Sequence, residues 1–189
     1  MKKNLVFLSG FMASGKSTIG PIIANTIGWN FFDLDRLIEE KEGKKIKDIF
    51  KEEGEEYFRA LEKEMLKDLL KLNKYIIALG GGTIADLTNL DLIKKNGLLI
   101  YLESSPEETY KRLRFKRDRP AFLFDEVEPS KEQFLQKINE LLDKRKQFYS
   151  MADVTINTDK LKIGQTVDKL ARIIKKEFDS EKDKNWTKK

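Results

Sequence analysis

A glycine-rich segment near the start of the chain has the form G-x-x-x-x-G-K-[ST] and spans residues 10–17. It follows the apolar run Leu5 to Ser9 and precedes a helical pattern that reaches Ile27. Glycines let the backbone curl so that its amides point inward, and a helix N-terminus adds positive potential at the same place. A strand, this loop and a helix in that order predict an α/β fold whose loop binds phosphate groups.

The residue types in this loop point to a nucleoside triphosphate. Lys16 would place its charge near the β- and γ-phosphates, and the Ser17 hydroxyl would face Mg²⁺, which binds mainly through phosphates and water. The alternative, a glycine-rich turn that only caps a helix, does not require the strand before it. We expect the nucleotide to contact Ala13, Ser14, Gly15, Lys16, Ser17 and Thr18.

Apolar runs and helical patterns alternate along the rest of the chain. This order is typical of an open, doubly wound, mostly parallel sheet with helices on both faces. The predicted strands are Leu5 to Ser9, Asn30 to Asp33, Tyr75 to Leu79, Leu98 to Glu103 and Asp153 to Asn157. The predicted helices cover 15–27, 35–42, 46–51, 55–72, 87–95, 107–113, 131–149 and 163–178.

Length and composition narrow the function classes. A chain of 189 residues predicts one domain, which we place at 1–178, followed by a polar, frayed tail at 179–189. The absence of Cys and His excludes thiol and imidazole chemistry. No run is apolar and long enough for a membrane span, so we expect a cytoplasmic protein with no membrane partner. The net charge of +5 is too small to indicate nucleic acid by itself.

Two carboxylates end the second predicted strand. Asp33 and Asp35 lie two residues apart, so in extended chain both side chains point to one side, at the sheet edge where open α/β sheets bind ligands. Asp35 has an equally strong alternative as the N-cap of the helix that follows. Capping and ligand binding are compatible.

Other candidates follow at the same edge. Gly80, Gly81 and Gly82 follow the third strand and would let the backbone pass close to a small ligand, or could form only a flexible turn. Arg59 taken alone is better explained by an exposed ion pair with Glu55. Arg145 taken alone fits a solvated helix face.

A basic segment from Lys111 to Arg119 precedes Pro120. An Arg on a closing segment can stabilise the charge that develops during phosphoryl transfer while the segment excludes water. The alternative is an RNA-contacting strip, but that needs stacking aromatic side chains, and only Phe115 lies among the basic residues.

In order and spacing, these motifs resemble the shikimate kinase family, up to about Phe178. The resemblance also includes Arg119-Pro120 and the stretch from Arg145 to Tyr149. It implies a three-layer α/β/α P-loop kinase fold with a five-stranded parallel sheet, similar to nucleoside monophosphate kinases. The implied reaction transfers a phosphoryl group from ATP, with Mg²⁺, to the 3-hydroxyl of shikimate, in the pathway to chorismate and the aromatic amino acids. A substrate-binding segment at about 33–60 and a lid at about 111–125 are also implied.

The resemblance also implies residue roles. Arg59 and Arg145 would receive the shikimate carboxylate, Asp35 its hydroxyls, and Gly80 to Gly82 would lie beneath it. Asp33 would act near Mg²⁺ through water. Arg112 would pack on adenine and Arg119 would contact the phosphates, so the implied catalytic residues are Lys16, Asp33 and Arg119.

Three questions stay open from the sequence. Asp33 could accept the hydroxyl proton or order a metal-bound water. Another small hydroxylated acid, or a nucleotide, could replace shikimate as acceptor, although two Arg residues favour a carboxylate. A regulatory module without turnover is the non-enzymatic alternative. We expect shikimate and ATP as partners, no nucleic acid, and a monomer.

Overall fold

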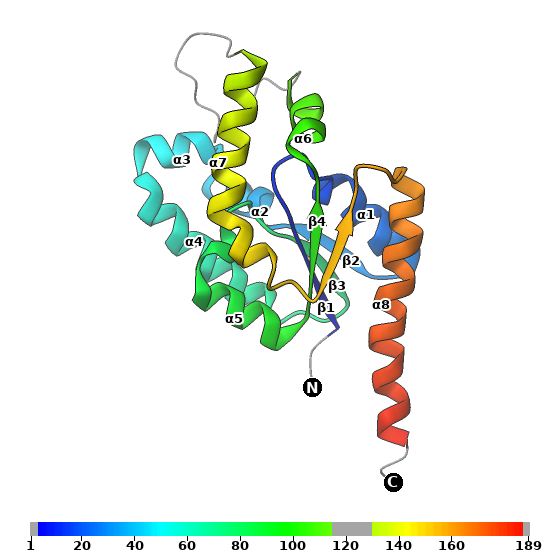
Figure 1. Cartoon of the computed structure of the whole chain (residues 1–189). Helices are drawn as coiled ribbons and strands as arrows, with labels where there is room; N and C mark the ends of the chain where they lie inside the picture. The colour runs from blue at the N-terminus through cyan, green and yellow to red at the C-terminus, as the bar shows by residue number, and fades with distance from the viewer. Residues whose placement is uncertain (1–3, 115–129, 187–189) are drawn as a thin grey trace.

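The computed structural model describes residues 4–114 and 130–186 as one α/β domain (Figure 1). Its strands are β1 (Leu5–Ser9), β2 (Asn30–Asp33), β3 (Tyr75–Ala78), β4 (Leu98–Glu103) and β5 (Val154–Asn157). Its helices are α1 (Lys16–Ile27), α2 (Leu34–Glu42), α3 (Ile46–Glu52), α4 (Gly54–Leu69), α5 (Leu87–Asn96), α6 (Pro106–Leu113), α7 (Lys131–Tyr149) and α8 (Ile163–Trp186), with a short 3₁₀ turn at Thr83–Ala85.

The five strands form one parallel sheet in the order β2-β3-β1-β4-β5. From β1 the chain crosses to the edge strand β2, returns inward to β3, and then crosses β1 to reach β4 and β5 on the other side. The direction of the connections changes beside β1, which makes the end of β1 a topological switch point. Helices cover both faces of the sheet (Figure 1). The predicted three-layer α/β/α architecture is confirmed, and the glycine-rich loop leaves the sheet at its centre.

Alternate residues of β1 supply two separate cores, which explains why this strand is apolar throughout. Leu5 and Phe7 join a cluster with α2, α4 and α5, whereas Val6 and Leu8 pack with α1 and α8. All four side chains are fully buried. Burial on both faces is expected for a central parallel strand and fixes the position of the loop that follows it.

A third, smaller cluster lies beyond the sheet. Phe11 of the glycine-rich loop packs with Leu113 of α6 and with Phe134 and Ile138 of α7. Tyr110 meets the Phe134 ring edge-on at 5.3 Å. This apolar contact holds α6 and α7 side by side next to the loop.

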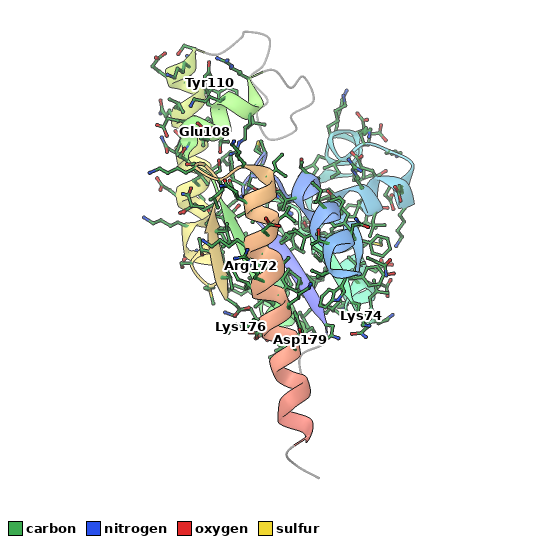
Figure 2. The ribbon with its side chains drawn as sticks, turned by 90° about the vertical axis from the view of Figure 1, so that its right-hand side faces the viewer. Lys74, Glu108, Tyr110, Arg172, Lys176 and Asp179 are labelled. Atoms are coloured by element: carbon green, nitrogen blue, oxygen red, sulfur yellow. The ribbon has the colours of Figure 1, made fainter. Side chains whose placement is uncertain are left out.

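Helix α8 differs most from the predicted bounds. It continues through Trp186, past the Phe178 end that the sequence predicts for this helix. Residues 179–186 contain no Gly or Pro, and one Glu and two Lys among them favour helix. The last turns extend past the rest of the domain, beyond Arg172 and Lys176 (Figure 2). None of the described helices is long and apolar enough to cross a membrane.

Gly97, between α5 and β4, tests the packing of the sheet. A Cβ at this position would lie 2.4 Å from the Leu5 carbonyl oxygen and 2.7 Å from the Phe7 ring. We expect Gly97→Ala to lower the free energy of unfolding by about 1–3 kcal/mol, because a buried backbone atom must move. Urea unfolding measures this change. Gly164→Ala is the matched control, since nothing lies within 4 Å of its added Cβ, and an equal loss in both variants would contradict the explanation.

Candidate active site

The glycine-rich loop has a backbone that few residues could replace. Gly10 and Gly15 have φ angles of 151° and 106°, and Ala13 has a φ of 57°. A Cβ on Gly10 would lie 2.5 Å from the Ser14 hydroxyl oxygen and 2.7 Å from the Leu102 carbonyl oxygen. Glycine is therefore required at position 10 both by its positive φ angle and by the lack of room for a Cβ atom. The Ser14 hydroxyl is buried and has no hydrogen-bond partner among the described residues.

The predicted nucleotide-binding residues line one pocket of about 370 Å³. Its walls are Ala13 to Ile19, Arg112, Thr158, Leu161, Ile163 and Thr166. Arg112 donates hydrogen bonds to the carbonyl oxygens of Ala13 and Thr158, both at 3.3 Å. These contacts bring α6, the loop and the start of the β5–α8 connection together. Thr158, Leu161 and Ile163 carry no motif, and sequence reasoning missed them.

Ser17 and Asp33 lie in direct contact. The Ser17 hydroxyl donates to Asp33 Oδ2 at 2.6 Å, and Asp33 Oδ1 accepts from the backbone N–H of Arg36 at 3.4 Å. Asp33 is thus the N-cap of α2, and the prediction that Asp35 could be the cap is wrong. The helix begins one residue earlier than expected, at Leu34, which leaves the Asp35 side chain available for the site.

Lys16 and Asp35 carry opposite charges in a poorly hydrated place. Lys16 donates to the carbonyl oxygens of Gly10 at 2.8 Å and Phe11 at 3.2 Å. Burial lowers its pKa from 10.5 to about 8, although Asp35 and Asp33 act in the opposite direction. Burial raises the pKa of Asp35 from 3.8 to about 6, and the Asp33 carboxylate raises it further while Lys16 opposes the rise.

The glycine run is the point where three predicted substrate residues meet. A Cβ on Gly80 would lie 2.5 Å from Asp35 Oδ1, on Gly81 3.0 Å from Arg145 Nη1, and on Gly82 2.7 Å from Arg59 Nη2. The run also makes the turn into Thr83–Ala85. Asp35 comes from α2, Arg59 from α4 and Arg145 from α7.

Arg59 is held by two carboxylates. Its Nε and Nη2 donate to Glu55 at 3.2 Å, as the ion-pair alternative predicts, and its Nη1 donates to Glu62 at 2.8 Å. Glu62 is 1% exposed and also accepts from the Thr83 hydroxyl at 2.6 Å. Sequence reasoning missed Glu62. Its position, one turn after Phe58 on the buried face of α4, was the signal, because an acid there needs a partner.

Arg145 also faces the site, and the solvated-face alternative is wrong. The residue is half-buried, and its guanidinium lies 5.7 Å from the centre of the Phe11 ring. One turn later on α7, burial raises the pKa of Tyr149 and the Arg145 charge partly opposes that rise. Arg119 and the lid residues 115–125 lie outside the described residues.

These features define a class of protein. A phosphate-binding loop at the centre of a parallel five-stranded sheet, with a cluster of charged side chains beside it, is the architecture of a phosphate-loop kinase. The shikimate kinase family profile matches residues 12–175, and the chain belongs to that family. It is a phosphotransferase that uses ATP as co-substrate.

Individual relatives agree in sequence and in structure. The chain is 45% identical over 172 residues to a shikimate kinase of Chlorobium limicola, covering 90% of this chain and 86% of the relative. A crystal structure of shikimate kinase from Bacteroides thetaiotaomicron has a TM-score of 0.82 and 30% identity, covering 90% and 98% of the two chains. Shikimate kinase from Acinetobacter baumannii in complex with shikimate has a TM-score of 0.81 and 31% identity, covering 92% and 93%.

The raised pKa of Asp35 predicts a pH-dependent cost to stability. The folded protein holds the Asp35 proton more tightly than the unfolded chain, so its stability falls as the pH rises from about 4 through about 6. The full effect is about 2–3 kcal/mol, at about 1.4 kcal/mol for each pKa unit. We expect Asp35→Asn to gain stability relative to the unsubstituted protein over this range.

Urea unfolding without ligands, at several pH values between 4 and 8, measures this gain. Asp168→Asn, on the exposed side of α8, is the matched control and should follow the unsubstituted protein. If the gain of Asp35→Asn does not change with pH, the Asp35 carboxyl does not have the raised pKa.

Proposed function

We propose that this site transfers the γ-phosphoryl group of ATP to the 3-hydroxyl of shikimate. The observation that carries the proposal is the convergence of Asp35, Arg59 and Arg145 on the glycine run beside the phosphate-binding loop. Two guanidinium groups over adjacent glycines suit a carboxylate, because each can grip it with parallel hydrogen bonds. The ionised Asp35 carboxyl lies beside Gly80 and suits the hydroxyl groups of the substrate, because it can accept their hydrogen bonds.

In this reaction the 3-hydroxyl oxygen forms a bond to the γ-phosphorus while the bond from that phosphorus to the β–γ bridging oxygen breaks. ADP leaves and shikimate 3-phosphate forms. Lys16 now donates to Gly10 and Phe11 carbonyls and would turn to the phosphates when they bind. The hydroxyl proton leaves toward Asp33, either directly or through a water that Asp33 orders.

Magnesium fits the oxygen donors of Ser17 and Asp33. A hydroxyl and a carboxylate oxygen 2.6 Å apart are hard ligands of the kind Mg²⁺ prefers, and the nucleotide would supply the other oxygens. We propose that Ser17 holds the ion directly and Asp33 through water. When bound, the ion neutralises charge on the phosphates.

The remaining roles rest on the family resemblance. We propose that Arg112 packs on adenine, and its hydrogen bonds to Ala13 and Thr158, which line the same pocket, support this role. Arg119 is proposed to contact the phosphates from the lid. We further propose a cytoplasmic monomer that needs neither membrane nor nucleic acid.

The central experiment measures ADP release with ATP and Mg²⁺, with shikimate, without it, and with a panel of other hydroxy acids. We expect release only with shikimate. We also expect Arg145→Ala to raise the KM for shikimate about 10- to 100-fold, because charged hydrogen bonds are lost, and to change the KM for ATP little. Lys144→Ala, the neighbouring exposed residue, is the control.

Two results would contradict this assignment. Turnover of a different hydroxy acid, with none of shikimate, would keep the kinase fold and reject the acceptor. Turnover of shikimate with an unchanged KM in Arg145→Ala would instead remove Arg145 from carboxylate binding.

The metal assignment predicts a separate effect. Asp33→Asn should raise the Mg²⁺ concentration for half-maximal activity about tenfold or more, as expected for a residue that orients metal-bound water. A magnesium titration at saturating ATP and shikimate measures this value. A lower kcat with an unchanged magnesium requirement would assign Asp33 to proton transfer alone.

A further inference from the structure

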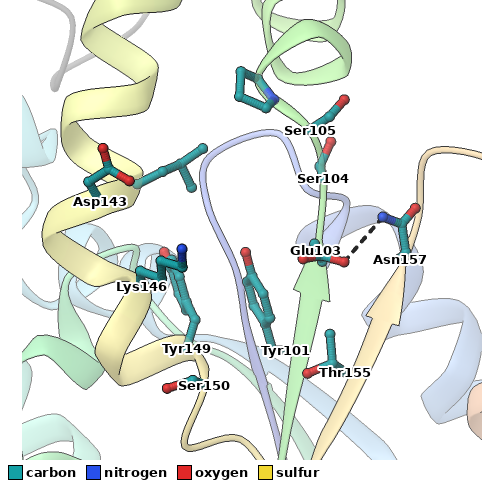
Figure 3. A pocket seen from close by; sticks show the side chains of 12 residues that line it. Tyr101, Glu103, Ser104, Ser105, Asp143, Lys146, Tyr149, Ser150, Thr155 and Asn157 are labelled. Atoms are coloured by element: carbon teal, nitrogen blue, oxygen red, sulfur yellow. Dashed lines mark hydrogen bonds between the residues drawn. The ribbon is translucent and has the colours of Figure 1, made fainter.

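A second cleft, of about 440 Å³, lies outside the candidate active site (Figure 3). It opens between the ends of β4 and β5, the start of α6 and the second half of α7. None of its lining residues lines the nucleotide pocket or was assigned a role above. Its volume falls in the range of ordinary small-molecule sites, about 300–1,000 Å³.

Two stacked tyrosines form part of the apolar lining of this cleft. The rings of Tyr101 on β4 and Tyr149 on α7 lie 4.3 Å apart and within 9° of parallel. The Tyr149 hydroxyl is buried and has no hydrogen-bond partner within the described part of the chain. Burial, with smaller contributions from Tyr149 and Glu103, raises the pKa of Tyr101, so its hydroxyl stays a neutral donor. Only a small part of the pair faces the cleft, because Tyr101 is 9% and Tyr149 3% exposed, and Pro106 and Leu142 supply the rest of the apolar lining.

Charged side chains of both signs line the cleft and come from two opposite walls. Asp143 and Lys146 project from α7, and Glu103 lies across from them at the end of β4 (Figure 3). The Glu103 carboxylate accepts one hydrogen bond, from the Asn157 side chain at 3.1 Å. Across residues 4–114 and 130–179, neither Asp143 nor Lys146 forms an ion pair, although they are one turn apart on α7.

This charge pattern selects among ligand types. A simple anion could pair with Lys146 but would meet two carboxylates, and a simple amine would leave Lys146 unpaired. A molecule with an ammonium and a carboxylate on the same carbon atom satisfies both signs. An apolar side chain on the same molecule could cover the apolar lining.

We propose that this cleft is a second binding site, for an α-amino acid with an apolar side chain. The carboxylate pairs with Lys146, the ammonium group with Glu103 across the cleft, and the side chain packs against Leu142 and the exposed part of Tyr101. Serine and threonine hydroxyls at Ser104, Ser150 and Thr155 complete the polar rim.

Calorimetric titration of the ADP-saturated protein tests the proposal with three probes that share one ring. We expect phenylalanine to bind about tenfold or more tightly than phenethylamine or 3-phenylpropionate. Leucine, which has an alkyl side chain, should bind as well. Because the cleft is separate from the nucleotide pocket, omitting ADP should leave the affinity for phenylalanine unchanged.

Single substitutions then locate the site. Lys146→Met should weaken phenylalanine about tenfold and leave phenethylamine unchanged, whereas Glu103→Gln should weaken both. Lys144→Met, on the same helix but outside the cleft, should change neither. The proposal is overturned if neither amino acid binds saturably, if 3-phenylpropionate binds as tightly as phenylalanine, if ADP competes with it, or if Lys146→Met and Lys144→Met act alike.

Discussion

The approach of charged side chains to a backbone without Cβ atoms is the constraint on which the candidate site depends. Asp35, Arg59 and Arg145 each occupy the space that a side chain on Gly80, Gly81 or Gly82 would need. Because β3 pairs with β1, this run lies next to the phosphate-binding loop. The sheet order therefore brings the proposed sites for the phosphoryl donor and the acceptor together, and the glycines let the three charged side chains lie close to the backbone.

The same closeness makes the site electrostatically costly. Burial lowers the pKa of Lys16 and raises that of Asp35, so it disfavours the charged form of each group, and the attraction between them only partly offsets the lost hydration. Glu62 avoids this problem because Arg59 and Thr83 satisfy its two oxygens. Lys16 donates to the backbone carbonyls of Gly10 and Phe11, which carry no net charge, and ligand phosphates can supply it with anionic partners. Ligand hydroxyls can donate to Asp35. Lys16 and Asp35, whose charges lose hydration in the protein without ligand, are thus two of the residues proposed to bind the ligands.

Local patterns predicted much of this structure, and contacts across the chain were beyond them. The bounds of β1, β2 and β4 follow from short apolar runs, and Asp33 and Asp35 follow from their place at a strand end. Arg112 meets the Ala13 carbonyl across 99 residues, which no local spacing encodes. The choice of Asp33 over Asp35 as the helix cap depended on its hydrogen bonds to Arg36 and Ser17, so strand and helix patterns could not settle it.

Hydrogen bonds tie the three walls of the nucleotide pocket to one another. Asp159, in the β5–α8 connection, accepts from the Ser104 hydroxyl and the Ser105 backbone N–H, each at 3.1 Å. Ser105 in turn caps α6 by accepting from the Glu108 N–H. Arg112, on the same helix, contacts the phosphate-binding loop and Thr158. The resemblance assigns the lid to the segment that begins at the end of α6. A nucleotide in this pocket would therefore contact, through Arg112, the helix from which the lid begins.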